Sequence, residues 1–458
     1  MKNAVQRKDK FQAKYAPATV NLKVAARLDG MRSGFSTEAQ YYYAKEQQAQ
    51  GLLNTSSPVV PTIRYPFYLN FVRVLWSLQR RGIHGPTLES AVDGLLASWA
   101  VRGLSLGTLQ RLALAASNYW PPAPDITVAG GASAPCVNTT NNKLYIMNST
   151  ANSVSIIDIV TGTLITTVAV GVAPMCSCYN PTNNKVYIGC QGANSVVILD
   201  GATNVATTLV AIGTAPQALC YNVTNNKVYC ADVGANVVHI IDGATNAILA
   251  SPAVGTAPVS CCYDVTDNKV FVANTATNNV SVINGATNAI DATVAVGLGP
   301  FHVAFFQARN KIYCVNSTGN SVSIIIGATN AVAATPAVGA LPMFACVNPT
   351  SNKVYISNNG ADSMSVIDGT SNLVTATVAV GLAPIGICYN QTDNKAYSSN
   401  YTGDSISIID GVSNVVLATV TVGNQPDVPI WDSVTDKIFV PNFLGGTVSI
   451  IDGKLNKA

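Results

Sequence analysis

The chain has 458 residues, of which 48% are hydrophobic and 11% are charged, and its net charge is +3. A charged fraction this far below the usual ~25% excludes a disordered polyampholyte and a charge-rich coiled coil. No run of about 18 uncharged apolar residues occurs, and the first residues lack the apolar core of a secretory signal. We therefore expect a protein without a membrane span, made in the cytoplasm.

The charge is divided unequally along the chain. Residues 1–124 hold 15 Lys or Arg against 6 Asp or Glu, a balance of +9, whereas residues 125–458 hold 11 against 17, a balance of −6. A basic module of this kind binds nucleic acid or docks on an acidic protein surface. Its arginines are dispersed among apolar residues rather than clustered, which favours other protein subunits as partners over nucleic acid.

The first part of the chain predicts an extended arm and then helices. Residues 1–35 are basic and weakly patterned, which is typical of an arm. Capping signals and apolar spacing predict a small α-helical domain over 36–120, with helices at about 37–52, from 66, from 87 and over about 105–117. The last two helices could form a helix-turn-helix for DNA, but Arg111 is the only charge on the second. A proline-rich linker follows at 121–125.

The rest of the chain, 126–458, repeats itself. A lysine recurs every 42 residues, at 143, 185, 227, 269, 311, 353, 395 and 437. Each lysine opens a β-rich run, followed by a Gly/Asn turn, a second run, an Asp-Gly-Ala-Thr-Asn turn or a variant, a third run and, after a proline, a fourth. Four short strands in such a period predict one blade of a β-propeller.

Counting the strands predicts the number of blades. Three of the four strand types appear eight times, but the outer strand appears only seven times after Lys143. The missing copy is the segment Ile126-Thr-Val-Ala-Gly130 at the front of the repeat region. We predict a mainly β fold, an eight-bladed propeller whose last blade is closed by the strand at 126–130, because closure removes an exposed sheet edge.

The amino-acid sequence of the repeat resembles that of a known family. Asn-Lys-Val-Tyr-Ile, Asn-Ser-Val-Ser-Ile-Ile-Asp-Gly and Ala-Thr-Val-Ala-Val-Gly resemble the YVTN-type repeat of YncE-like and archaeal surface proteins, over about 126–453. The resemblance implies the propeller fold. It implies little about function, since propellers serve as enzymes, adhesins and scaffolds.

Three residue types recur in columns of the repeat. Six cysteines share one column on the inner strand and are predicted to be buried free thiols that are too far apart to bridge one another: Cys136, Cys178, Cys220, Cys262, Cys346 and Cys388. An asparagine column is predicted to cap strand ends, with ligand or cation binding as the alternative: Asn148, Asn274, Asn316, Asn358, Asn400 and Asn442, with Asp232 and Cys190 at the other two positions. The eight lysines are predicted to be solvated turn residues.

Nothing in the sequence predicts catalysis. Haem attachment would need Cys-x-x-Cys-His, which is absent, and the three histidines have no metal-ligand spacing. Quinoprotein propellers carry recurrent tryptophans, but Trp431 is the only tryptophan of the repeat region. We therefore expect no enzyme, no cofactor, no metal and no catalytic residues, and an enzyme that uses the central channel is the disfavoured alternative.

Irregular aromatic and basic residues are the candidate contact residues, because interfaces favour such side chains. In the propeller they fall in the fifth and eighth repeats, where repacking between unlike blades is the alternative explanation. The candidates are Phe301, His302, Phe305, Phe306, Arg309, Trp431 and Phe443 in the propeller, and Tyr41, Tyr42, Tyr43, Arg80 and Arg81 in the amino-terminal part.

A basic arm, a helical domain that can anchor it and a disk-shaped propeller together resemble the layout of an assembly subunit. We expect a structural protein of a virion, associated with the capsid or tail of a phage, anchored by residues 1–124. Its propeller would be displayed for decoration or for adhesion to a ligand on a host surface. The alternative is a YncE-like binding protein, cytoplasmic in location, with a protein, glycan or nucleic-acid ligand.

Overall fold

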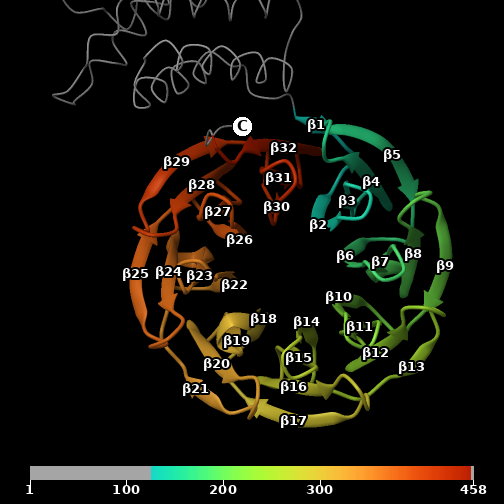
Figure 1. Cartoon of the computed structure of the whole chain (residues 1–458), viewed down its shortest axis with the longest axis horizontal. Helices are drawn as coiled ribbons and strands as arrows, with labels where there is room; N and C mark the ends of the chain where they lie inside the picture. Colours follow the sequence, from blue (N-terminus) through green and yellow to red (C-terminus); the bar gives the residue numbers. More distant parts are fainter. Residues whose placement is uncertain (1–124, 455–458) are drawn as a thin grey trace, which may run out of the picture. The chain divides into compact units, whose positions relative to one another are not determined.

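The computed structural model describes residues 125–454, and these form eight four-stranded antiparallel sheets arranged in a ring (Figure 1). The mainly β, eight-bladed propeller predicted from the repeat is confirmed. The predicted arm, helices and linker lie at residues 1–124, outside the described residues. Within 125–454, no helix is long and apolar enough to cross a membrane.

Seven of the eight blades run from the centre of the ring outward in chain order, and the eighth takes its outer strand from β1 (Figure 1). Six of the inner strands begin with a proline. Blade one is β2 (Ala132–Asn138), β3 (Lys143–Asn148), β4 (Ser153–Asp158) and β5 (Thr163–Ala169). Blade two is β6 (Pro174–Asn180), β7 (Lys185–Cys190), β8 (Ser195–Asp200) and β9 (Ala206–Ala211). Blade three is β10 (Pro216–Asn222), β11 (Lys227–Asp232), β12 (Val237–Asp242) and β13 (Ile248–Ala250). Blade four is β14 (Pro258–Asp264), β15 (Lys269–Asn274), β16 (Asn279–Asn284) and β17 (Ile290–Ala295).

The second half of the ring repeats this plan. Blade five is β18 (Pro300–Phe306), β19 (Lys311–Asn316), β20 (Ser321–Ile326) and β21 (Val332–Ala334). Blade six is β22 (Pro342–Asn348), β23 (Lys353–Asn358), β24 (Ser363–Asp368) and β25 (Val374–Ala379). Blade seven is β26 (Pro384–Asn390), β27 (Lys395–Asn400), β28 (Ser405–Asp410) and β29 (Val416–Thr421). Blade eight is β30 (Ile430–Asp432), β31 (Lys437–Asn442), β32 (Thr447–Asp452) and β1 (Ile126–Thr127). Single 3-10 turns follow β7, β18 and β23 at Gln191–Ala193, Gln307–Arg309 and Asn359–Ala361.

Blade eight is closed by the first strand of the repeat region. Ile126 pairs with Val448 and Thr127 with Thr447, and the N–H of Val128 donates to the carbonyl of Gly446 at 2.9 Å. The closing strand is shorter than the predicted 126–130, because the chain turns at Gly131, whose φ of +78° lies in the left-handed region. The eighth sheet therefore joins the two ends of the ring.

The recurrent Asp-Gly-Ala-Thr-Asn segment builds the turn between the third and fourth strands. In blade two, the carboxylate of Asp200 accepts hydrogen bonds from the N–H groups of Ala202 and Thr203, at 3.0 and 2.7 Å, and Asn204 takes a φ of +64°. These bonds hold the pKa of Asp200 below its usual value. The same lowering of pKa occurs at Asp242, Asp368 and Asp410. Asx-type hydrogen bonding and tolerance of positive φ explain why Asp and Asn recur here.

The lysines lie between blades and are not free turn residues, which corrects the prediction that they are solvated. The Nζ of Lys143 donates to the carbonyls of Gly201 and Ala202 and to Oδ1 of Asn204, at 2.8, 2.9 and 2.8 Å, all in the next blade. Six further lysines reach the next blade in this way: Lys185, Lys227, Lys269, Lys311, Lys353 and Lys395. Each of these seven lysines therefore links its own blade to a turn of the next blade.

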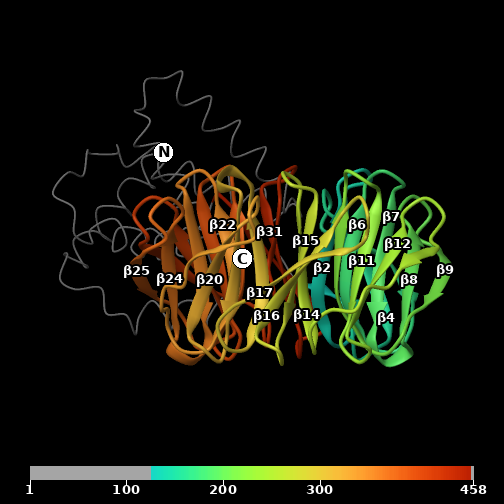
Figure 2. The ribbon, with the colours of Figure 1, turned by 90° about the horizontal axis from the view of Figure 1, so that it is seen from below.

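Apolar side chains fill the space between blades. A column of large aromatic residues on the second strand is fully buried: Tyr145, Tyr187, Tyr229, Phe271, Tyr313, Tyr355, Tyr397 and Phe439. Seen from the side, the strands stand roughly upright and the connecting turns lie at the two faces of the ring (Figure 2). The faces are therefore made of turns, and the core consists of the layers between sheets.

Candidate functional site

In six of the eight blades, the asparagine column forms a buried hydrogen-bonded link between the second and third strands, here called a staple. Nδ2 of Asn316, at the end of β19, donates to the hydroxyls of Ser321 and Ser323 on β20, at 3.1 and 3.0 Å. The N–H of Gly297 donates to the same Ser323 hydroxyl at 3.2 Å. The same Asn–hydroxyl bonds occur at Asn274, Asn358, Asn400 and Asn442. The asparagines are buried, so they do not form an open ring of ligands.

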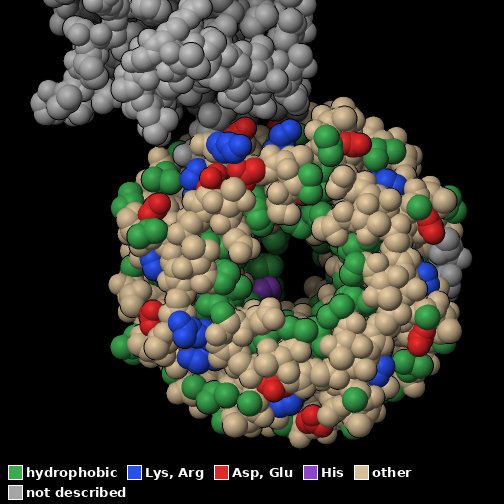
Figure 3. Space-filling view, viewed as in Figure 1, with side chains coloured by type: hydrophobic (Ala, Val, Ile, Leu, Met, Phe, Trp, Pro, Cys, Tyr) green, Lys and Arg blue, Asp and Glu red, His purple; other side chains and the backbone are tan. Residues whose placement is uncertain are grey.

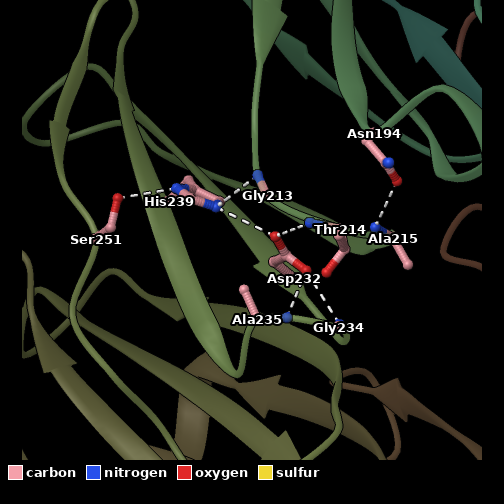
Figure 4. Close-up of polar contacts among 9 residues, drawn as sticks. All are labelled: Asn194, Gly213, Thr214, Ala215, Asp232, Gly234, Ala235, His239 and Ser251. Carbon is pink, nitrogen blue, oxygen red and sulfur yellow. Dashed lines mark hydrogen bonds and ion pairs between the residues drawn. The ribbon is translucent and has the colours of Figure 1, made fainter.

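Blade three replaces both members of the staple with titratable residues (Figure 4). Asp232 ends β11 where other blades have asparagine, and His239 lies on β12 at the serine position. Nε2 of His239 lies 3.3 Å from Oδ2 of Asp232, and Nδ1 lies 2.8 Å from the hydroxyl of Ser251. An acid, a histidine and a serine therefore form a continuous chain, with Asp232 fully buried and Ser251 exposed.

Backbone N–H groups surround the carboxylate of Asp232. Oδ2 accepts from Thr214 at 2.7 Å, and Oδ1 accepts from Gly234 and Ala235, both at 3.0 Å (Figure 4). Three such bonds offset the cost of burying a carboxylate, which would otherwise be large. In the tautomer of His239 that carries its proton on Nε2, this nitrogen donates to the ionised Asp232 and Nδ1 accepts from Ser251. In that tautomer Nε2 does not also accept from the N–H of Gly213, which lies 3.3 Å away.

That order of groups is the order found in serine hydrolases, in which the histidine takes the proton of the serine hydroxyl. Such an enzyme also needs donors for the oxyanion of the tetrahedral intermediate. The N–H groups of Thr214, Gly234 and Ala235 donate to Asp232 instead, so none of these three is left to stabilise an oxyanion at Ser251. The N–H of Gly213 faces Nε2 of His239, whereas Ser251 contacts the other ring nitrogen, Nδ1.

Each bond of the blade-three chain has a counterpart in a blade that carries serine at the position of His239. The Asp232–His239 spacing of seven residues repeats the bond from Asn316 to Ser323. The His239–Ser251 spacing of twelve repeats the 3.3 Å contact between the hydroxyls of Ser155 and Thr167 in blade one. The Gly213 contact to His239 repeats the one from Gly297 to Ser323. Asp232, His239 and Ser251 therefore occupy the positions of the staple. In the staple the asparagine donates to the serine, whereas in blade three the histidine donates to the aspartate.

Of the candidate contact residues of blade five, Phe306 is buried and His302 is half-buried against a neighbouring ring. Phe306 is only 1% exposed and lies in the core between blades five and six, which corrects its assignment as a contact residue. His302 packs on Phe344 with ring centroids 4.4 Å apart, and its Nδ1 accepts from the N–H of Ala345 at 3.3 Å. Burial lowers the pKa of His302 to about 4, so the ring is neutral at physiological pH.

The remaining candidates have mixed positions. Phe301 and Phe305 are half-buried, and Arg309 is exposed, with its Nε donating to Oδ1 of Asn352 at 2.6 Å. In blade eight, Trp431 and Phe443 are half-buried, and Nε1 of Trp431 donates to Asp436 at 3.1 Å. Tyr41, Tyr42, Tyr43, Arg80 and Arg81 lie outside the described residues. The structure does not gather these side chains into one site.

Sequence reasoning missed the pairing of Asp232 with His239. Asp232 was visible as an exception in the asparagine column, and His239 replaces a serine seven residues later in the same repeat. The signal in the sequence was that one repeat departs from the pattern at two positions seven residues apart, the spacing at which Asn and Ser are bonded in other blades. Among residues 125–454, no group of three or more His, Cys, Asp or Glu side chains could hold a metal ion.

The surface offers no concentrated charge on the face drawn in Figure 3. Hydrophobic side chains line the central opening, and lysines, arginines and acids are scattered around the ring (Figure 3). A polyanion-binding site would need positive charge gathered in one place.

Comparison with known proteins supports the fold. No protein-family model matches the chain, and no curated protein matches it in sequence. Among solved structures, BamB from Moraxella catarrhalis is similar over 72% of this chain and 98% of its own, with 11% identity and a TM-score of 0.58. The dihydro-heme d1 dehydrogenase NirN is similar over 77% of this chain and 87% of its own, at 14% identity and TM-score 0.56. Kuenenia stuttgartiensis hydrazine synthase is similar over 62% and 97%, at 17% identity and TM-score 0.52. At these identities the likeness concerns the fold alone.

Proposed function

We propose that the protein is a non-enzymatic structural subunit whose propeller is a rigid display module of the YVTN type. The observation that carries this proposal is the bond-by-bond correspondence between Asp232–His239–Ser251 and the staples of ordinary blades. The one hydrolase-like arrangement in the described residues thereby has a structural role. The lysine contacts between blades support rigidity in the same way.

The assembly is proposed to be a virion, with the capsid or tail of a phage as its site and residues 1–124 as the anchor. The +9 charge of that segment against the −6 of the rest supports an anchor that binds acidic protein surfaces. The propeller then projects from the particle. It serves as decoration or as an adhesion module that holds a ligand on a host surface through blades five and eight; exposed Arg309 breaks the pattern in blade five.

The anchor is tested by removing charge from one part of the full chain at a time. Lys8→Gln with Lys10→Gln removes two positive charges from the arm. The matched control, Val412→Glu with Val434→Glu, changes the net charge equally at propeller positions that are 71% and 61% exposed. The fraction of tagged chain that sediments with the assembled particles is measured at low and high salt.

We expect the arm variant to incorporate several-fold less than wild type, and the control to incorporate normally. Screening at a Debye length of about 10 Å near 0.1 M salt weakens the wild-type attraction, so the difference shrinks as salt rises. Equal loss in both variants would contradict the anchor. Hydrolysis of a simple ester by wild type that is abolished by Ser251→Ala would contradict the non-enzymatic assignment.

A further inference from the structure

Two cysteines from different columns of the repeat face each other between blades three and four. Cys220 lies on β10 and pairs across the sheet with Tyr229, while Cys261 lies on β14 and pairs with Val272. β10 and β14 are neighbouring inner strands of the ring (Figure 1). Because side chains alternate along a strand, residues one apart face opposite blades. Cys220 therefore faces blade four, and Cys261 faces back toward blade three.

The packing shows this orientation directly. Cys220 and Cys261 pack against one apolar cluster, formed by Tyr229, Val238 and Ile240 of blade three with Val270, Val272 and Ile283 of blade four. Cys262, the next residue along β14, packs against the cluster between blades four and five. Cys261 is the largest single influence on the pKa of Cys220, as expected for neighbouring thiols.

The same facing position recurs at every junction between consecutive blades, 41 residues apart in sequence. In blades one and two, Ser177 is the side chain there that acts on the pKa of Cys136 and lowers it, against the larger effect of burial. In the described residues the facing pairs are Cys136–Ser177, Cys178–Leu219, Cys220–Cys261, Cys262–Val303, Ala304–Ala345, Cys346–Ile387 and Cys388–Pro429. The junction between blades three and four is the one in this set that brings two thiols together.

We propose that Cys220 and Cys261 are a redox-active pair that closes to a disulfide between blades three and four on reaction with an oxidised low-molecular-weight disulfide. One cysteine loses its proton, and its thiolate attacks a sulfur of the reagent, which forms a mixed disulfide and releases one small thiol. The other cysteine, also as a thiolate, displaces the second small thiol. The pair loses two electrons and two protons, and the reagent leaves as two thiols.

Both residues are half-buried on inner strands, and we expect a small reagent to reach them from the central opening. The neighbouring Cys261 and burial hold the pKa of Cys220 well above its usual value. The thiolate is therefore scarce at neutral pH. The disulfide forms slowly there and faster as the pH rises.

The test uses the full-length chain in its reduced form. The protein is incubated with oxidised glutathione at pH 7 and pH 9, remaining thiols are alkylated, and peptides are mapped by mass spectrometry without reduction. We expect a Cys220–Cys261 linked peptide, the loss of two of the eleven thiols, faster formation at pH 9 and reversal by dithiothreitol.

Three variants give the controls. Cys220→Ser and Cys261→Ser should each abolish the linked peptide. Cys262→Ala is the matched control, since that residue adjoins Cys261 but faces Val303, and it should leave the linkage intact. The proposal is overturned if the native chain links other cysteines instead, or if Cys220 and Cys261 stay reduced while the urea-unfolded chain forms mixed disulfides. Loss of the linkage in Cys262→Ala also overturns it.

Discussion

The buried asparagine staples should contribute measurably to stability, and Asn400→Ala is the sharpest test. Nδ2 of Asn400 donates to the hydroxyls of Ser405 and Ser407, at 3.1 and 3.0 Å, and its Oδ1 accepts from the N–H of Gly381 at 3.1 Å. Asn400 is fully buried, so water does not replace these bonds. At about 1 kcal/mol for each bond, the substitution should cost about 3 kcal/mol of unfolding free energy.

Equilibrium unfolding of the full chain in urea, followed by tyrosine fluorescence and circular dichroism, measures this cost as a lower midpoint. The matched control is Asn424→Ala, because Asn424 is exposed and substitution at such a position should change the free energy of unfolding by no more than about 0.5 kcal/mol. Equal midpoints for Asn400→Ala and Asn424→Ala would refute the view that the staples stabilise the blades.

Three further predictions concern blade three, the acid range and ring closure. Asp232→Asn with His239→Ser rebuilds the ordinary staple, so urea unfolding should place it within about 1 kcal/mol of wild type. It should lie closer to wild type than Asp232→Asn alone, in which an imidazole instead of a serine hydroxyl remains opposite the new amide. A double variant no more stable than the single one would contradict the structural role. Four turn carboxylates have folded pKa values below their unfolded ones: Asp200, Asp242, Asp368 and Asp410. Their contribution to stability is therefore present above about pH 4 and is lost as the pH falls through the folded pKa values. Thermal melts between pH 7 and pH 3 should show this loss as a falling melting temperature, and an unchanged melting temperature would contradict it. Deleting residues 1–130 should expose the edge of β32 and promote aggregation in light scattering, whereas deleting 1–120 should not; identical behaviour of the two would count against closure by β1.

The ring was predictable because its information is periodic. The 42-residue spacing of the lysines and the additional copy of the outer strand at Ile126 predict the number of blades and the strand that closes the last one, without any knowledge of contacts. The roles of single columns were harder to predict, because they depend on the neighbouring blade. The partner of Lys143 lies 58 to 61 residues further on, at a turn that only the packing of blade two brings close.

The contact residues show the same limit. An aromatic side chain that departs from a repeat can fill a gap between unlike blades or cover a binding surface, and composition does not distinguish these. Phe306 fills the core, whereas Arg309, three residues on, is exposed. Asp232 and His239 could have been paired from the sequence, but only once the Asn–Ser contact of the other blades was known.

The central claim is that residues 1–124 anchor the protein and the propeller is displayed. Its most direct test is a structure of the assembled particle, with the area buried against other subunits measured residue by residue. We predict that residues 1–124 bury more intersubunit area than residues 125–458, and that any propeller contact falls mainly on blades five and eight. A propeller that buries more area than residues 1–124 would contradict the account.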